Sequence, residues 1–268
     1  MEINKTKVFD FWEESSCGEE LYLNESSKSG FETQSNERYR LEPYIIPFAD
    51  FNSAQNKKVL EIGVGLGSDH QKFAEVTNDL YGIDLTKRAI KNTTDRFKIF
   101  DLKSNLSIGD AEALKFEDNF FDIVYSWGVL HHSPNTPEAI NEVYRVLKKG
   151  GSAKIMIYNK WSLIGLMLWV RYALFTFKPW TKLETIYDKF LESPGTKAYT
   201  KKEAKKLFSN FQHVSISSVL THGDLLESNA GQRHKGFLLN LARKIWPRRM
   251  LKKLFPEFGL FMLIDARK

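Results

Sequence analysis

Short apolar runs alternate with longer amphipathic stretches between residues 57 and 158. Runs such as 59–62 and 121–126 are typical of buried strands, whereas the stretches between them carry apolar residues at helical spacing. Strands and helices in strict alternation build a parallel sheet with helices on both faces. The pattern therefore predicts an α/β fold. It places five strands in this region, at 59–62, 80–84, 105–109, 121–126 and 153–158.

Polar residues, prolines and glycines mark where the helices of this region begin and end. Ser68 and Thr86 each precede an amphipathic stretch, and we expect their side chains to cap the helix that follows. The Thr-Pro-Glu sequence at 136–138 combines a cap residue, a proline in the first turn and an acid near the positive end of the helix dipole. Two lysines and a glycine at 148–150 are expected to close that helix.

After the fifth strand the composition changes. The stretch 161–170 is strongly apolar, but Arg171 interrupts it before the ~20 residues that a membrane-spanning helix needs. We interpret it as a helical lid that covers a substrate cavity or rests on a lipid surface, with a helix buried against the domain as the alternative. Residues 221–257 interleave apolar and basic side chains, which suits an anionic membrane interface or a solvated basic face. Alternation at 213–219 and 259–266 predicts two more strands.

The composition is that of a globular protein, with 42% hydrophobic and 27% charged residues. The net charge of +6 permits an anionic partner without requiring one. The single cysteine, Cys17, excludes a disulfide framework and a cysteine-ligated zinc or iron–sulfur cluster, and we expect no metal. The N-terminal region lacks a basic segment followed by an apolar one, so we expect a cytoplasmic protein.

The first apolar run breaks into alternating glycines, Gly63, Gly65 and Gly67. Glycine lets the backbone turn sharply and lets a ligand lie directly on it. The free N–H groups of the helix that follows point back at this turn, so the segment predicts a nucleotide cradle. A dinucleotide-binding fold, as in NAD-dependent dehydrogenases, uses the spacing G-x-G-x-x-G, whereas here the third glycine comes one residue early.

Two acids distinguish between the ligands that such a cradle holds. Glu61 stands two residues before the first glycine, where a carboxylate repels a pyrophosphate but attracts a cationic amino group. S-adenosylmethionine carries such a group, and NAD does not. Asp84 ends the second strand about 20 residues beyond Gly63, where a carboxylate accepts hydrogen bonds from both ribose hydroxyls. The two acids therefore favour S-adenosylmethionine over NAD.

Six segments follow one another along this region: E-I-G-V-G-L-G at 61–67, G-I-D-L at 82–85, G-D-A-E at 109–112, F-D-I-V at 121–124, V-L-H-H at 129–132 and R-V-L-K-K-G-G at 145–151. In this order and spacing they resemble the class I S-adenosylmethionine-dependent methyltransferases, in particular the branch related to ubiquinone/menaquinone-biosynthesis methyltransferases. Each segment is weakly diagnostic alone, but their succession is specific for the family and says little about the substrate.

The resemblance implies a Rossmann-like, seven-stranded, mostly parallel sheet whose last strand lies antiparallel between the fifth and the sixth, with helices on both faces and helical lid insertions. It implies that Asp110 accepts a hydrogen bond from the adenine amino group and that Ala111 lies against the ring. Trp127 and Gly128 would lie beside the sulfonium, with simple packing as the alternative for the tryptophan. The expected cofactor site comprises Glu61, Gly63, Gly65, Gly67, Asp84, Leu85, Asp110, Ala111, Trp127, Gly128, Tyr39 and Arg40.

The resemblance also suggests how the chain is divided. Residues 1–50 are expected to cap the cofactor site, with Tyr39 and Arg40 as candidates to touch the cofactor. The alternative is that the aromatic residues of this segment only fix a helix to the domain. The other expected parts are the cofactor-binding core at 51–158, the apolar helical insertion or substrate lid at 159–199, and the C-terminal part of the sheet at 200–268 with its basic insertion at 221–257.

Methyl transfer from a sulfonium needs few catalytic residues, because the positive charge already activates the methyl group and the protein mainly aligns the reactants. A base is required only if the acceptor must lose a proton. His131 and His132 follow the carboxyl end of the fourth strand, where open α/β sheets bind their ligands. His222 belongs to a polar cluster of the second insertion. All three are candidate bases, and a structural role is the alternative for each.

The leading hypothesis is a methyltransferase that acts on an O, N or C atom of a small-molecule or lipid-like acceptor. The apolar 161–177 and basic 238–253 segments also suit peripheral contact with the inner membrane surface. The basic excess makes an RNA-directed methyltransferase the first alternative, but the chain lacks the N/D-P-P-Y/F/W motif for exocyclic base amines, so nucleic acid is not the expected partner. A non-catalytic cofactor-binding protein of the same fold is the second alternative.

Overall fold

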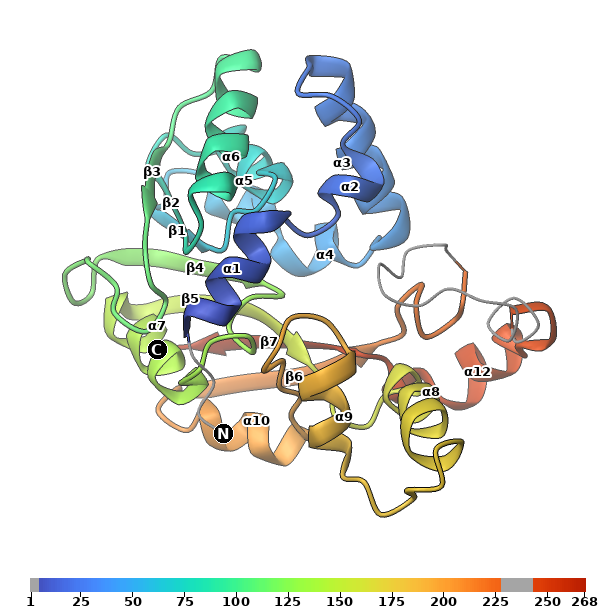
Figure 1. The fold of residues 1–268 in the computed structure, drawn as a ribbon. Coiled ribbons are helices and arrows are strands. Elements are labelled where there is room, and N and C mark those ends of the chain that lie inside the picture. Colours follow the sequence, from blue (N-terminus) through green and yellow to red (C-terminus); the bar gives the residue numbers. More distant parts are fainter. Residues whose placement is uncertain (1–4, 228–242) are drawn as a thin grey trace.

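The computed structural model describes residues 5–227 and 243–268. Its strands are β1 (Val59–Ile62), β2 (Leu80–Asp84), β3 (Asn105–Ile108), β4 (Phe121–Trp127), β5 (Leu147–Tyr158), β6 (His213–Val219) and β7 (Phe261–Arg267). They form one seven-stranded sheet in the order β3-β2-β1-β4-β5-β7-β6 (Figure 1). Strands β1 to β5 are parallel, and β7 lies antiparallel between β5 and β6. The predicted fold class is confirmed, including the place of the last strand.

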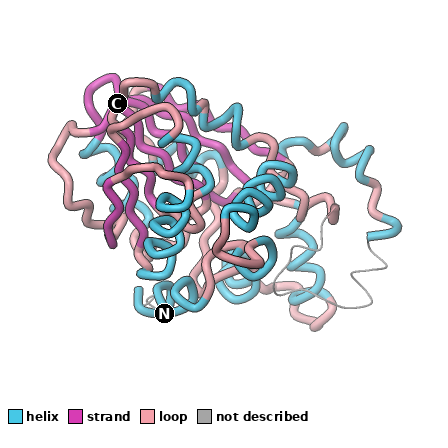
Figure 2. Tube along the Cα trace, turned by 90° about the horizontal axis from the view of Figure 1, so that it is seen from above, coloured by secondary structure: helices cyan, strands magenta, loops and turns pink. Residues whose placement is uncertain are grey.

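Helices lie on both faces of this sheet, as the view from above in Figure 2 shows. The helices are α1 (Lys5–Glu14), α2 (Glu19–Tyr22), α3 (Lys28–Leu41), α4 (Ile45–Ala49), α5 (Ser68–Ala74), α6 (Lys87–Ile99), α7 (Thr136–Val146), α8 (Leu163–Trp169), α9 (Leu183–Phe190), α10 (Lys201–Leu207) and α12 (Arg248–Leu254). In Figure 1, α5 and α6 cover one face, and α7 and α10 cover the other.

Successive strand side chains point to opposite faces of the sheet, and they form the two main clusters of the buried core. Leu60 and Ile62 of β1 pack with residues of α7 and α10. Val59, which precedes Leu60 and points the other way, packs on the opposite face with Phe73 of α5 and Phe97 of α6. Successive strand residues point to opposite faces, so a sheet buried on both sides carries nearly continuous apolar runs. This is why the short apolar runs were recognisable as strands.

The helix caps agree only in part with the sequence. Thr86 caps α6 as expected, through a hydrogen bond from a backbone N–H to its hydroxyl. The cap of α5 is Gly67 in the left-handed conformation, at φ 76°, and Ser68 is the first helical residue, so that prediction is wrong. Asn135 rather than Thr136 caps α7 with its side chain. In both cases the loop before the helix contains a residue better suited to the bend.

The predicted close of α7 at 148–150 is also wrong. Helix α7 already ends at Val146, and Leu147 starts β5 because it pairs with Phe121 of β4. Gly150 has a φ of 79°, which accommodates a turn within β5 rather than a helix end. Pairing along the sheet therefore outweighs the local preference of the Lys-Lys-Gly sequence for a helix C-terminus.

Both insertions contribute helices beside the sheet. The apolar stretch forms α8 and continues as a π-helix, Val170–Leu174. Within the described residues, none of the helices has the length and apolar character to cross a membrane. The part of the basic insertion at 228–242 lies outside the described residues. In its remainder, α12 lies beside α8 (Figure 1), and Leu163 and Leu251 share a small buried cluster.

Candidate active site

A cavity of about 210 Å³ opens where the parallel strands end. Its wall includes Gly63 after β1, Asp84 at the end of β2, Gly109 after β3, Gly128 after β4 and Tyr158 at the end of β5. Open α/β sheets bind their ligands at this edge. Every residue of the expected cofactor site lines the cavity except Tyr39 and Arg40.

The glycine turn presents bare backbone to this cavity. Gly63 adopts a φ of 85°, and a Cβ there would lie 2.1 Å from Cγ2 of Val129, so a larger residue does not fit. Gly65 adopts a φ of 52°, and a Cβ on it would meet no atom within 4 Å. Positive φ values favour glycine. The space in front of Gly65 is therefore available to a ligand that approaches the main chain.

Glu61 is buried beneath the turn, with 3% of its surface exposed, and it is paired with a histidine. Its Oε2 lies 2.9 Å from Nδ1 of His70, whose Nε2 lies 2.7 Å from Oγ of Ser104. Ser104 donates its hydroxyl hydrogen to the carbonyl of Leu80, so it accepts from the Nε2–H of His70. Nδ1 then carries the lone pair, and the proton between the two side chains belongs to Glu61.

The pKa directions agree with this arrangement. Burial, together with the negative charges of Asp69 and Asp84, raises the pKa of Glu61 well above its usual value. Burial lowers the pKa of His70 to about 3. Without a ligand, a protonated Glu61 and a neutral His70 are therefore the stable forms.

Hydrogen bonds fix the two other strand-end acids. The Asp84 carboxylate accepts from the backbone N–H of Thr86 at 3.0 Å, from its hydroxyl at 2.8 Å and from the N–H of Gly65 at 3.2 Å. Asp110 pairs with Lys5 of α1, whose Nζ lies 2.6 Å from Oδ2 of Asp110 and 2.7 Å from Oε2 of Glu112. Helix α1 is thus fastened across the Asp110 side of the cavity.

Helix α3 supplies a wall that the sequence did not predict correctly. Gln34, Arg38 and Glu42 line the cavity from one side of this segment, because residues four apart lie on one face of a helix. Tyr39 and Arg40 are off this face. The hydroxyl of Tyr39 donates to Asp69, and Arg40 is paired with Glu37 at the surface with 65% of its side chain exposed.

Asp69, at the start of α5, joins this wall to the sheet. Its carboxylate accepts from Nε and Nη2 of Arg38 at 3.2 and 2.7 Å, from Tyr39 at 3.1 Å and from Tyr125 at 2.8 Å. Burial opposes ionisation, but Arg38 and the hydrogen bonds hold the pKa of Asp69 below its usual value. Glu42 has less support: burial raises its pKa to about 7 against the attraction of Arg38.

The three candidate bases lie in different surroundings. His132 lines the cavity. His131 does not: it is fully buried between the rings of His132 and Tyr158, at centroid distances of 4.2 and 3.9 Å, and burial lowers its pKa well below the usual value. His222 is partly buried away from the cavity wall, where burial lowers its pKa and Arg40 opposes its protonation. Among the three, only His132 is placed to reach a ligand.

S-adenosylmethionine fits the residues at this site. When bound, it supplies a methyl group on a positively charged sulfur. Its amino group would take the buried carboxylate of Glu61, its ribose hydroxyls Asp84, and its adenine amino group Asp110. The open space in front of Gly65 admits a ligand against the backbone. The cavity is lined by six acidic and two basic side chains, which suits a positively charged ligand: Glu42, Glu61, Asp69, Asp84, Asp110 and Glu192 against Lys5 and Arg38.

A pH dependence of binding follows from Glu61. S-adenosylhomocysteine carries the same amino group, and an ammonium beside Glu61 favours its ionised form. Because the pKa of Glu61 is raised before binding, a proton must leave as the ligand binds, and affinity is expected to increase as pH rises. The increase approaches about tenfold per pH unit below the raised pKa. Calorimetry from pH 5.5 to 8, in two buffers of different ionisation enthalpy, measures the affinity and the number of protons released. An affinity that does not change with pH would contradict the role of Glu61.

Several residues of the cavity wall went unnoticed in the sequence, because contacts between distant segments bring them to it. The positions 34, 38 and 42 carried a detectable signal, since polar residues recur there at helical spacing. Glu192 and the residues of α1 carried none. The wall residues that the sequence patterns do not predict are Lys5, Trp12, Cys17, Gln34, Arg38, Glu42, Asp69 and Glu192, which lies next to His132. His70, which lies behind Glu61, is not predicted either.

The sheet order, the glycine turn and the strand-end acids are those that the resemblance to the class I S-adenosylmethionine-dependent methyltransferases implies. Residues 60–155 match the family described as "Methyltransferase domain". Residues 60–155 therefore carry a methyltransferase domain, and the chain is similar to the ubiquinone/menaquinone-biosynthesis methyltransferases.

The chain is similar to several curated relatives. Phosphoethanolamine N-methyltransferase 2 of Caenorhabditis elegans is 36% identical over 115 residues, which are 42% of this chain and 26% of the relative. Sterol 24-C-methyltransferase erg6 of Aspergillus fumigatus is 32% identical over 100 residues, 36% of this chain and 26% of the relative. Ubiquinone/menaquinone biosynthesis C-methyltransferase UbiE of Burkholderia cenocepacia is 28% identical over 157 residues, which are 56% of this chain and 61% of the relative. The chain thus spans less than two thirds of these relatives.

Solved structures share the fold. A SAM-dependent methyltransferase from Archaeoglobus fulgidus superposes with a TM-score of 0.55 at 19% identity, over 93% of this chain and 97% of that one. The YcgJ protein of Bacillus subtilis gives a TM-score of 0.55 at 18% identity, over 86% of this chain and 98% of that one. At these identities the likeness concerns the fold alone.

Proposed function

We propose that this chain is an S-adenosylmethionine-dependent methyltransferase that acts on an O, N or C atom of a small-molecule or lipid-like acceptor. The observation that carries the proposal is the cavity at the strand ends, where the glycine turn, Glu61 and Asp84 lie together. The curated relatives act on phosphoethanolamine, sterols and quinones by their names, which supports a small acceptor.

The expected parts of the chain have distinct tasks in this proposal. Residues 51–158 hold the methyl donor, residues 1–50 cap it, and residues 159–199 form the substrate lid. Within the cap, Trp12 and Lys5 of α1 and Arg38 of α3 line the cavity. The protein aligns the acceptor with the methyl group and keeps water out, which is the main requirement for this displacement.

Two experiments test the function. Calorimetric titration with S-adenosylhomocysteine and with NAD should give binding of the former alone. Incubation with a labelled methyl donor and a host-cell extract, followed by mass spectrometry, should then identify a labelled small molecule or lipid. Binding of NAD alone would contradict the assignment. Label found only in RNA would favour the RNA-directed alternative, and binding without any labelled product would favour a non-catalytic protein.

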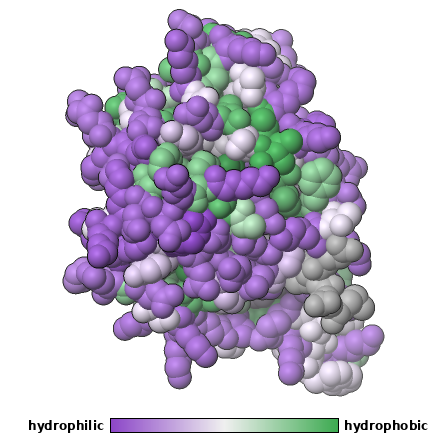
Figure 3. Space-filling view, turned by 90° about the vertical axis from the view of Figure 1, so that its left-hand side faces the viewer, coloured by the Kyte–Doolittle hydropathy of each residue, from purple (hydrophilic) through white to green (hydrophobic). Residues whose placement is uncertain are grey.

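Peripheral contact with an anionic membrane is a further part of the proposal, and exposed side chains support it. In the first insertion Phe175, Phe177 and Trp180 are 66%, 86% and 77% exposed, and in the second Ile245 and Leu254 are 73% and 60% exposed. Exposed basic residues accompany them on both insertions: Arg171, Lys178, Lys244, Arg249, Lys252 and Lys253. Interleaved aromatic and basic side chains suit an anionic interface. The side of the molecule seen in Figure 3 is instead mostly hydrophilic, with hydrophobic residues gathered near its middle.

The double variant Phe177→Ser/Trp180→Ser is expected to bind anionic vesicles at least about tenfold more weakly than the parent. Full burial of each aromatic side chain contributes about 1.5–3 kcal/mol, so even partial insertion gives this effect. Flotation with phosphatidylserine-containing vesicles measures it. Ile108→Ser, on the exposed side of edge strand β3, is the control and should float like the parent. A parent protein that stays at the bottom of the gradient contradicts membrane contact.

A further inference from the structure

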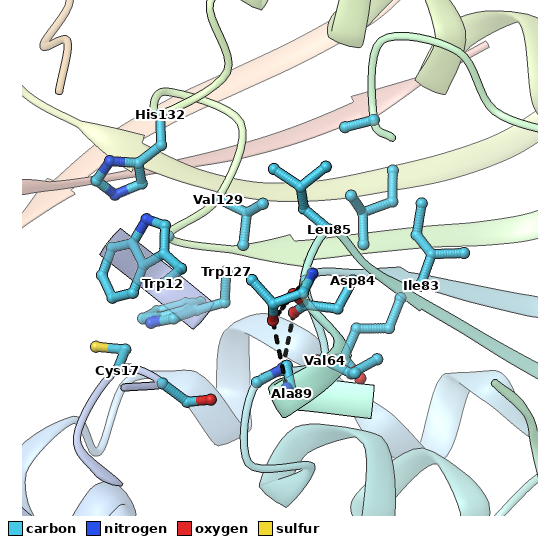
Figure 4. A pocket seen from close by; sticks show the side chains of 18 of the residues that line it. Trp12, Cys17, Val64, Ile83, Asp84, Leu85, Ala89, Trp127, Val129 and His132 are labelled. Atoms are coloured by element: carbon cyan, nitrogen blue, oxygen red, sulfur yellow. Dashed lines mark hydrogen bonds between the residues drawn. The ribbon is translucent and has the colours of Figure 1, made fainter. Parts of the chain in front are cut away.

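The cavity has two chemically different ends. Figure 4 shows Ile83, Asp84, Leu85, Val64 and Ala89 gathered on one side, where the donor's nucleoside is expected. Trp12, Cys17, Trp127 and His132 gather on the other side (Figure 4). Contacts place Glu192 and Tyr158 with this second group: the Tyr158 hydroxyl donates to Oε2 of Glu192 at 2.6 Å. We call Trp12, Glu42, His132, Tyr158 and Glu192 the acceptor end.

Glu192 is the centre of this end. Its Oε2 lies 3.5 Å from Nε2 of His132 as well as accepting from Tyr158, and its Oε1 lies 3.9 Å from the sulfur of Cys17. The second carboxylate, Glu42, shares Arg38 with Asp69, and Arg38 lies closer to Asp69, at 2.7 Å against 3.6 Å. One guanidinium thus serves two carboxylates. The acceptor end retains an excess of negative charge within a chain whose net charge is +6.

Two buried polar atoms of the acceptor end have no hydrogen-bond partner within residues 5–227 and 243–268. They are Oε2 of Glu42 and Nε2 of His132, and both residues line the cavity. Buried polar atoms are nearly always hydrogen-bonded, and one left unpaired costs about 1–3 kcal/mol. Such atoms at a cavity wall indicate a ligand that supplies hydrogen-bond donors.

The surroundings of His132 permit the tautomer that a proton acceptor needs. Nδ1 lies 2.8 Å from Oγ of Ser193 and 3.1 Å from Oγ1 of Thr196. Thr196 donates its own hydrogen to the carbonyl of Ser193, so its oxygen has a lone pair for an Nδ1–H. In the neutral tautomer with its hydrogen on Nδ1, Nε2 presents a lone pair next to Glu192.

We propose that the acceptor end binds a protonated amine, and that this amine is the methyl acceptor; the inference rests on the proposed methyltransferase function. Ammonium N–H groups match the lone pairs of Glu42, Glu192 and His132, and the rings of Trp12 and Tyr158 attract a cation. A carboxylate or phosphate acceptor would face like charge here, and a neutral alcohol would not offset the excess of negative charge.

The reaction at this end balances with the groups present. An ammonium nitrogen has no lone pair, so it first gives a proton to Nε2 of His132, and the imidazolium is stabilised by Glu192. The freed nitrogen lone pair forms the new N–C bond, the donor's C–S bond breaks, and its electron pair stays on sulfur. The methylated ammonium leaves, and His132 returns its proton to solvent.

Matched probes test the charge preference without turnover. Benzylamine and cyclohexylamine are titrated by calorimetry into the protein saturated with S-adenosylhomocysteine, alongside benzyl alcohol and cyclohexanol. We expect each amine to bind at least about tenfold more tightly than its alcohol at pH 7. Glu192→Gln, likewise saturated with S-adenosylhomocysteine, should remove most of this preference. Glu184→Gln, whose exposed side chain lies on α9 just before Glu192, is the control and should behave like the parent.

The outcomes separate this inference from the function beneath it. Alcohols that bind as tightly as the amines, or an amine preference that survives Glu192→Gln, would overturn the amine assignment even if the labelled-donor experiment succeeds. Failure of S-adenosylhomocysteine to bind the parent protein contradicts the proposed function instead. His132→Gln supplies a second readout: turnover of the identified acceptor should fall at least about a hundredfold because the variant lacks the base, and parent-like turnover would remove His132 from the reaction.

Discussion

Replacing Glu61 with glutamine is expected to weaken S-adenosylhomocysteine binding by about 2–5 kcal/mol, at least about thirtyfold in Kd. The variant keeps the volume of the side chain and a donor for Nδ1 of His70, but it removes the carboxyl group beneath the glycine turn that would ionise when the ligand's ammonium binds. The ligand's ammonium then has no partner at that point. Calorimetry at pH 7.5 measures the loss.

The same variant should be at least as stable as the parent without ligand. The pKa of Glu61 is raised in the folded state, so its contribution favours folding at low pH and is lost as pH rises through the raised pKa. Glutamine does not titrate, so the Tm of the variant should lack the pH dependence that Glu61 contributes. Asp79→Asn, a half-exposed acid at the other end of β2, is the control. If Glu61→Gln binds S-adenosylhomocysteine as tightly as the parent, Glu61 does not bind the ligand's amino group.

Asp69→Asn is expected to reduce the free energy of unfolding by about 3–5 kcal/mol, because it removes a buried carboxylate and leaves the partly buried guanidinium of Arg38 without its main counter-charge. At about 2–4 °C per kcal/mol, this lowers Tm by roughly 10 °C. Thermal and urea unfolding of the unliganded protein measure the change. The contribution of Asp69 is present at neutral pH and is lost as pH falls through its lowered pKa.

Two comparisons isolate the buried pair as the cause. Glu75→Gln breaks the exposed ion pair with Lys72 on the same helix and should change stability by no more than about 1 kcal/mol. The double variant Arg38→Met/Asp69→Asn removes the uncompensated charge, so Asp69→Asn should cost far less in that background than alone. Additive losses would show that the pair is not the source of the effect.

Much of the fold could be predicted because the relevant signals are local. The apolar runs of β1 and β4, the alternating glycines and the acids at the strand ends each lie within a few residues, and the periodicity of a sheet buried on both faces is plain in the sequence. Where neighbouring elements compete, local rules fail. Leu147 pairs with β4 although the residues after it would close a helix, and Gly67 takes the cap position from Ser68 because the turn needs a positive φ.

The rest of the site depends on contacts between distant segments. His70 acts on Glu61 only because α5 folds back over β1, and Glu192 reaches His132 across about 60 residues of sequence. The error at Tyr39 and Arg40 is one of helix phase: the segment was correct, but the face that meets the cavity carries Arg38 instead. The direction in which a helix is turned is set by its packing partners, and a single sequence specifies these poorly.

Helix α1 is fastened lightly compared with the sheet it covers. Val8 is its buried residue in the described structure, and the Lys5 bridge to Asp110 and Glu112 is 38% exposed on the lysine side, where each ion pair is worth at most about 1 kcal/mol. Detaching α1 from the sheet therefore costs a small part of the roughly 5–15 kcal/mol that is the free energy of unfolding of a whole domain. We therefore expect spent donor to exchange for fresh donor through a local opening at this corner, faster at high salt, while the strands stay paired.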